Sequence, residues 1–281
     1  MNYNGSAPPD INAAQQVIFG RPLITLGDDK DEGLIEKQVD YMRGSTHYIV
    51  THFILECCKK LEAKCITSAT AACLFHKFFS CANILDYDPY LVAGTCIYLG
   101  GKVEDDHLKL RDVINVVHAV LHRTLEPLAL GDEYWNIRDA IVQTELFVLR
   151  MVGFQVRFIH PHKYLLHYLS SIRDWMSAED WDKYPLAETS WKLLQDLYHD
   201  PHVLSTDPSI TALGIIQLTL EIYGIQIPLM NGIESGEKAW FKILSKKATK
   251  EKLWEVMTRS IEVYNKEAAA LEPISSKITC S

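Results

Sequence analysis

The sequence of 281 residues lacks the features that mark secreted or membrane-spanning proteins. It has no C-x-x-C pair, and its seven cysteines are an odd number that lie mostly in apolar runs, where a thiol packs as a small hydrophobic side chain. This usage favours a reducing compartment, the nucleus and/or the cytoplasm. The longest uncharged runs, such as residues 89–101, are shorter than the ~18 residues that a membrane span needs. The N-terminus has neither the basic start nor the apolar stretch of a signal peptide.

Basic charge is also scarce. The chain has 28 Lys and Arg against 36 Asp and Glu, which gives a formal net charge of −8. Because phosphate binding needs a basic face, the composition argues against a protein whose main role is to coat nucleic acid, although it leaves a local basic patch open. The G-x-S-x-G, kinase H-R-D and D-F-G, and H-E-x-x-H motifs are all missing, so no known catalytic motif indicates an enzyme.

Three short motifs could suggest binding sites, and each has a simpler interpretation. A phosphate loop would end at Lys102, but Cys96 replaces its first glycine and Val103 its hydroxyl residue. Residues 104–107 (EDDH) cannot all reach one tetrahedral ion, so we interpret them as a solvated charge run. His160 and His162 flank a proline and are typical of a helix start. We therefore predict no cofactor and no metal.

Apolar residues recur with helical period from about residue 33 to residue 265, and strand-like alternation is absent over any useful length. In the first half the pattern predicts five helices. The first covers about 45–61, the second begins after Thr67 as its N-cap, and the third begins at Asp88-Pro89. The fourth lies around 113–121, and the fifth covers 132–152 and ends at Gly153. In the second half it predicts five more: from His160-Pro161, around 191–198, from Asp207-Pro208, at Trp240-Phe241, and after Thr249.

The two halves look like a duplication. Asp88-Pro89 and Asp207-Pro208 lie 119 residues apart, and each precedes a helix that is apolar on all sides and rich in small residues. We therefore predict an all-α fold in which a five-helix unit occurs twice. The predicted bounds are 34–158 and 159–268, between a loosely ordered tail at 1–33, with one short helix near 11–19, and a C-terminal tail at 269–281.

Several strings resemble the cyclin family. TAACLFHKFF, DYDPYLVAGTCIYLGGKVED and TELFVLRMVGFQV are similar to the first cyclin box, and HPHKYLLHYL is similar to the second half of transcription-type cyclins. The resemblance covers roughly residues 45–264. It implies two tandem cyclin boxes, and a non-catalytic subunit that activates a cyclin-dependent kinase as a heterodimer, in cell-cycle or transcription control. More narrowly, DPYL, HKFF, RDVINV and FQVRFIHPHKYLLHYL resemble the cyclin Q branch, which implies the tenth-numbered cyclin-dependent kinase as partner.

Two charged residues stand out in the first half. Lys102 ends the apolar third helix, and Glu145 interrupts the apolar stripe of the fifth, where a carboxylate is costly unless it is paired. From the residues alone, a structural ion pair and a partner contact are equally good interpretations. The resemblance implies that the two residues face each other and hydrogen-bond the kinase near its regulatory helix. It also implies an apolar cradle for that helix, formed by Leu99, Leu149, Phe154 and Val156.

The second half lacks a matching Lys-x-Glu after its central helix, where the sequence reads EIYGIQIP. An M-R-A-I-L-like substrate-docking patch is also absent from the first helix, where the sequence reads VTHFI. Two other functions stay open. One is a cyclin-fold transcription factor of the general factor IIB type that binds DNA or polymerase, and the other is a helical enzyme whose site has an unfamiliar pattern.

Overall fold

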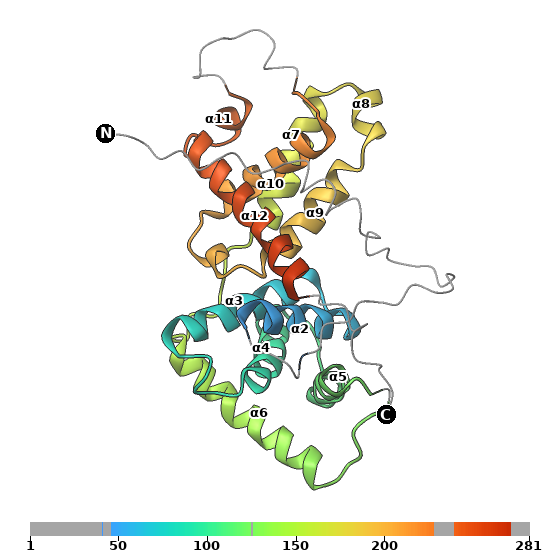
Figure 1. Cartoon of the computed structure of the whole chain (residues 1–281), viewed down its shortest axis with the longest axis vertical. Helices are drawn as coiled ribbons and strands as arrows, with labels where there is room; N and C mark the ends of the chain where they lie inside the picture. Colours follow the sequence, from blue (N-terminus) through green and yellow to red (C-terminus); the bar gives the residue numbers. More distant parts are fainter. Residues whose placement is uncertain (1–40, 42–45, 125, 228–238, 271–281) are drawn as a thin grey trace, which may run out of the picture. The chain divides into compact units, whose positions relative to one another are not determined.

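The computed structural model describes Tyr41 and residues 46–124, 126–227 and 239–270. These residues are all-helical, as predicted (Figure 1). The predicted tail at 1–33 and its short helix lie outside the described residues. The helices are α2 (His47–Lys60), α3 (Cys65–Cys81), α4 (Pro89–Val103), α5 (Leu110–His122), α6 (Asp132–Met151), α7 (His162–Trp175), α8 (Ala178–Lys183), α9 (Leu186–Leu197), the 3-10 helix η1 (Pro201–Leu204), α10 (Pro208–Tyr223), α11 (Trp240–Leu244) and α12 (Lys250–Ala270).

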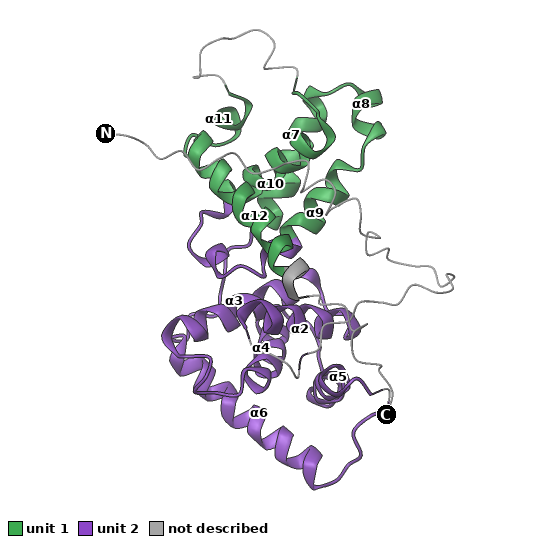
Figure 2. Cartoon of the chain, in the orientation of Figure 1, with its two compact units in different colours: residues 1–38, 161–194, 209–281 green, residues 39–160, 195–208 purple. Residues whose placement is uncertain are grey.

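The chain divides into two compact units (Figure 2). The front unit contains residues 39–160 and 195–208, and the rear unit contains the described parts of 161–194 and 209–281. Segment 195–208, with the end of α9 and η1, therefore belongs with the front unit although it lies in the second half of the sequence. The bounds given above for the two cyclin boxes stay a prediction.

Helix α4 is the centre of the front unit, and its start follows from local chemistry. The Asp88 side chain accepts hydrogen bonds from the backbone amides of Tyr90 (2.9 Å) and Leu91 (3.3 Å), and Pro89 occupies the first turn. Residues 92–97 are all buried. A Cβ atom at Gly100 would lie 3.1 Å from the backbone oxygen of Thr67, so the missing side chain lets α3 and α4 approach closely.

Helix α3 corrects one prediction, because Thr67 is not its N-cap. The helix already begins at Cys65. The cap comes from the loop after α4, where Asp106 Oδ2 accepts hydrogen bonds from the Lys64 amide and from Thr67 Oγ1, both at 2.8 Å. The charge run at 104–107 is thus not simply solvated. Glu104 Oε1 also contacts α3, because it accepts a hydrogen bond from Thr70 Oγ1 at 2.7 Å.

The rear unit has its own central helix, α10, in which residues 209–216 are buried. Gly214 faces α12 so closely that an added Cβ atom would lie 2.6 Å from Val256 Cβ. On α12, Leu253, Met257 and Ile261 are buried, as their spacing predicts. The short elements α8 and η1 were not predicted, and neither has a buried residue that could produce an apolar pattern.

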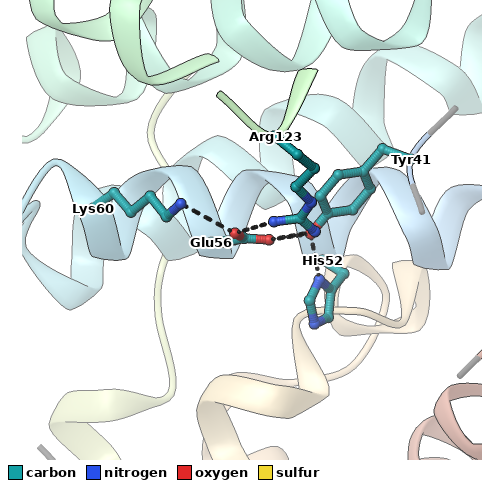
Figure 3. Close-up of polar contacts among 5 residues, drawn as sticks. All are labelled: Tyr41, His52, Glu56, Lys60 and Arg123. Carbon is teal, nitrogen blue, oxygen red and sulfur yellow. Dashed lines mark hydrogen bonds and ion pairs between the residues drawn. The ribbon is translucent and has the colours of Figure 1, made fainter. Parts of the chain in front are cut away.

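A polar cluster fixes Tyr41 against the front unit (Figure 3). The Tyr41 side chain is 2% exposed. Its hydroxyl donates to Glu56 Oε2 (2.5 Å) and lies 2.7 Å from His52 Nδ1. Arg123 Nη1 donates to Glu56 Oε1 at 2.8 Å, and its guanidinium carbon lies 4.8 Å from the centre of the Tyr41 ring. The cluster ties the chain just before α2 to α2 itself and to the end of α5.

Among the described helices, none combines the length and the hydropathy that crossing a bilayer would require.

Candidate functional surface

The two charged residues singled out by the sequence meet in the structure. Lys102 lies in the last turn of α4 and Glu145 in the second half of α6. The Lys102 ammonium donates to both carboxylate oxygens of Glu145, at 2.6 Å to Oε1 and 2.8 Å to Oε2. The contact is a charge-assisted hydrogen bond, which is stronger than one between neutral groups. The predicted pairing is therefore present in the free chain.

This ion pair is accessible from outside the chain. The Lys102 side chain is 46% exposed and the Glu145 side chain is 18% exposed. The Lys102 ammonium also lies 4.2 Å from the centre of the Tyr98 ring, one turn earlier on α4, which is within the range of a cation–π contact. Tyr98 and Glu145 together hold the ammonium at the surface, where another protein can reach it.

The four apolar residues of the predicted cradle differ in exposure. Leu99 is buried in the front unit, so packing within the chain accounts for most of its surface. Leu149 and Val156 are half-buried, whereas the Phe154 side chain is 62% exposed. Phe154 therefore offers the largest unburied apolar surface of the four, and Leu99 offers the least.

The backbone at Phe154 is unusual. Gly153 ends α6 with φ of +66°, and Phe154 follows it with φ of +57°. The Phe154 amide donates to the Leu149 carbonyl at 2.8 Å, which closes the helix end. A bulky residue in the left-handed region costs about 1–3 kcal/mol. Burial of the aromatic ring does not offset this strain, because the ring is mostly exposed to solvent.

Helix α6 carries further exposed apolar residues that the sequence reasoning missed. Its buried stripe contains Tyr134, Ile141 and Val148, each seven residues after the last. Trp135 and Val142 directly follow the first two of these, and both are exposed, as is Leu146. Because the two stripes have the same period, the spacing alone could not tell which of them faces solvent. The exposed stripe indicates that α6 has a second apolar face beside Glu145.

A small open hollow of about 220 Å³ lies beside the start of α4 and the middle of α6. Ligand sites usually enclose about 300–1,000 Å³, so the hollow offers little room for a cofactor. Within the described ranges, no group of three or more His, Cys, Asp or Glu side chains is placed to hold a metal ion. The hollow is lined by Tyr87, Asp88, Leu91, Val92, Gln143, Thr144 and Phe147.

The part of the chain that carries this surface is similar to known proteins. Residues 29–157 match the family described as cyclin, N-terminal domain. Cyclin-L1 of Gallus gallus is 29% identical over 217 residues, which cover 76% of this chain and 38% of that protein. Cyclin-L2 of Mus musculus is 28% identical over the same length, with 76% and 39% covered. The chain thus spans about two fifths of the length of these curated relatives.

Two solved structures share the fold. A chain of the yeast RNA Pol II CTD kinase CTDK-1 complex has a TM-score of 0.58 at 16% identity, with 84% of this chain and 78% of that chain covered. A chain of the CAK complex of Chaetomium thermophilum, bound to ATP-gamma-S, has a TM-score of 0.54 at 14% identity, with 91% and 71% covered.

The described helices, the match to the cyclin N-terminal domain and the likeness to the two solved structures show that this chain has the cyclin fold. Over residues 29–157 the chain is similar to the cyclin N-terminal domain, and over 217 residues it is similar to the cyclin-L proteins. The relatives named above carry cyclin-L names, so the narrower resemblance to the cyclin Q branch stays a prediction.

Proposed function

We propose that this chain is a non-catalytic regulatory subunit that binds and activates a cyclin-dependent serine/threonine kinase. One observation carries the proposal: the Lys102–Glu145 pair is formed in the free chain and is accessible, and α6, which carries Glu145, also exposes apolar side chains. Interfaces commonly combine apolar anchors with a few oriented polar groups. The surface therefore has the chemistry to hold an amphipathic helix of a kinase.

The mechanism follows from what a kinase needs. A kinase is active when its own Lys–Glu ion pair and its metal-binding Asp are aligned, and the position of a movable helix controls that alignment. A subunit that binds the aligned state more tightly shifts the population toward it. In this proposal the chain contributes Lys102, Glu145 and the apolar cradle, and the kinase contributes every catalytic group.

The comparisons support the kind of partner. The CTDK-1 complex is described as a CTD kinase, the CAK complex is described as bound to ATP-gamma-S, and both share the fold of this chain. By analogy we propose a heterodimer with a cyclin-dependent kinase that works in the nucleus, the cytoplasm or both, in transcription or cell-cycle control. The finer proposal is the cyclin Q branch with the tenth-numbered kinase as partner, which rests on the strings quoted above. Mass spectrometry of the kinase that co-purifies with the full chain tests it.

The central experiment removes the charged pair. We expect Lys102→Ala and Glu145→Ala each to weaken kinase binding by ~2–5 kcal/mol, because each leaves a polar partner unpaired in a desolvated interface. Co-purification, binding affinity and kinase activity are measured with the full chain, and circular dichroism reports the helical content of each variant.

A second ion pair supplies a matched control. Lys192 donates to Glu188 at 2.7 Å on α9, and both side chains are partly exposed. Lys192→Ala and Glu188→Ala should leave kinase binding unchanged. The proposal fails if the Lys102→Ala/Glu145→Ala double variant folds and still activates the kinase fully.

A further inference from the structure

The rear unit carries a concentration of positive charge in a chain whose net charge is −8. Five lysines fall within eleven residues that include most of α11, the turn after it and the first turn of α12, and all five are exposed. From residue 239 to residue 259 the chain adds one arginine and only two glutamates. We call the five residues the lysine patch: Lys242, Lys246, Lys247, Lys250 and Lys252.

Contacts show that the lysine patch is compact. Lys252 Nζ lies 3.5 Å from the backbone oxygen of Lys247, so the first turn of α12 folds back onto the preceding turn. Glu251 is close enough to Lys242 and Lys250 to interact with both charges. Hydrogen bonds from its own amide and from Thr249, together with those two lysines, hold the pKa of Glu251 below its ordinary value. One carboxylate thus lies among several ammonium groups.

Folding stability does not account for this arrangement. Lys250 and Lys252 lie in the first turn of α12, where the helix macrodipole disfavours positive charge. Like charges that crowd on one surface also repel one another. Lys250 and Lys252 therefore lie where the helix macrodipole opposes their charge, and binding of an anion would offset both this cost and the repulsion among like charges.

We propose that the lysine patch binds a polyanionic segment of a partner protein, one that carries several phosphoserine side chains. An ammonium group binds phosphate as a compact point charge and tolerates varied approach directions, which suits a flexible phosphorylated segment. Apolar contacts are available beside the charges, because the exposed fractions are 57% for Ile243 and 38% for Trp254. Trp254 follows Lys250 by four residues and so lies on the same side of α12.

A protein segment fits the lysine patch better than nucleic acid does. Exposed charges are screened beyond about 8 Å at physiological salt, so a short phosphorylated segment interacts with the lysines alone. A long nucleic acid would extend past the lysine patch onto a chain of net charge −8. Binding of single strands also relies on successive aromatic side chains for stacking, and Trp254 is the one exposed aromatic residue among 239–259.

The proposal is independent of the kinase proposal, because every residue of the lysine patch belongs to the rear unit whereas Lys102 and Glu145 belong to the front unit. The test uses the full chain and a fluorescent serine-rich peptide with four phosphoserines, next to the same peptide without phosphate. We expect the phosphorylated peptide to bind, and the affinity to fall as salt rises from about 50 to about 200 mM.

The test variant is Lys246→Gln/Lys247→Gln/Lys250→Gln, and the control is Lys59→Gln/Lys109→Gln/Lys183→Gln, which also removes three exposed lysines. The test variant should lose affinity by about tenfold or more, since three charge contacts are removed, and the control should bind as the unaltered chain does. Circular dichroism confirms that both variants are folded.

Three results would overturn the proposal. The first is that the phosphorylated peptide does not bind, and the second is that the folded test variant binds it unchanged. The third is that a single-stranded RNA of about twenty nucleotides, or vesicles rich in phosphatidylserine, bind more tightly than the peptide and with the same dependence on the three lysines.

Discussion

Individual side chains decide how firmly the start of the front unit is held. Tyr41 combines a buried ring with a hydroxyl that has two polar partners, Glu56 and His52. Arg123 neutralises the same carboxylate from the end of α5, where its own φ is +53°. Burial and the neighbouring Glu56 carboxylate raise the pKa of the Tyr41 hydroxyl, so it remains a hydrogen-bond donor at any physiological pH.

Replacing Tyr41 with Phe tests this cluster. We expect Tyr41→Phe to lower the free energy of unfolding by ~1–3 kcal/mol, because the ring is kept while Glu56 and His52 lose a buried partner. Urea unfolding followed by circular dichroism measures the change. Tyr87→Phe, at an exposed tyrosine, is the control and should stay within about 0.5 kcal/mol of the unaltered chain. Equal stability of the two variants would contradict the assigned role.

The sequence predicted part of the candidate site at this scale. The pairing of Lys102 with Glu145 could be predicted because an unpaired carboxylate in an apolar stripe is costly and because the cyclin resemblance supplied the partner. The contact of Lys102 with the Tyr98 ring could not, since it depends on the direction of two side chains. The exposure of Phe154 also needed the structure, because it results from two successive residues in the left-handed region.

At the scale of the helix, the start of a helix could be predicted when its capping residue is a neighbour in the sequence, and not when the capping residue is far away in the sequence. Asp88 was predicted as a cap because it lies next to Pro89 and the helix that it caps. The start of α3 was predicted wrongly, because its cap, Asp106, comes from a loop 42 residues away from Lys64. No local pattern records such a contact.

Close approach of α10 and α12 gives a prediction for Gly214. A methyl group at Gly214 would lie 2.6 Å from Val256 Cβ, so Gly214→Ala must displace one helix. We expect a loss of ~1–3 kcal/mol from overpacking, measured as a fall in the thermal midpoint. Gly94→Ala, inside α4, is the control, since a Cβ atom there would lie 3.4 Å from Val117 Cγ2, an ordinary van der Waals distance. An unchanged thermal midpoint in Gly214→Ala would contradict the close contact between Gly214 and Val256.

For the whole molecule, the duplication predicted the repeated central helices α4 and α10 but not the grouping of segment 195–208 with the front unit. That segment is held by polar contacts of two histidines, the buried His76 and the half-buried His160. His76 Nε2 donates to the Tyr198 carbonyl at 2.9 Å, and His160 Nδ1 lies 2.7 Å from the Tyr198 hydroxyl. Sequence patterns of apolar residues carry no information about such contacts.

These histidines predict how stability depends on pH. Burial lowers the pKa of His52, His76 and His160 to about 4. Above the ordinary pKa of 6.5 they are neutral in both the folded and the unfolded chain, so they add no pH dependence there. Between pH 6.5 and about pH 4 the histidines are protonated in the unfolded chain but not in the folded chain. The free energy of unfolding therefore falls, as the pH is lowered, by up to about 1.4 kcal/mol per pH unit for each histidine.

Urea unfolding at pH 7.5, 6.5 and 5.5 measures this loss. His76→Gln should make stability less dependent on pH, because it removes one of the buried titrating groups. Ser80→Ala, at an exposed position without a titrating side chain, should leave the pH dependence as it is. Stability that stays constant down to pH 5 would contradict burial of the neutral rings.

The Asp106 cap has a consequence for how the chain is made. The ribosome synthesises α3 before it reaches the residue that completes the start of that helix, and 42 residues separate Asp106 from Lys64. At 5–20 residues per second, this distance corresponds to a delay of roughly 2–8 s. During that interval the Lys64 amide and the Thr67 hydroxyl lack their Asp106 acceptor, and they gain it only after α4 and the following loop have been translated.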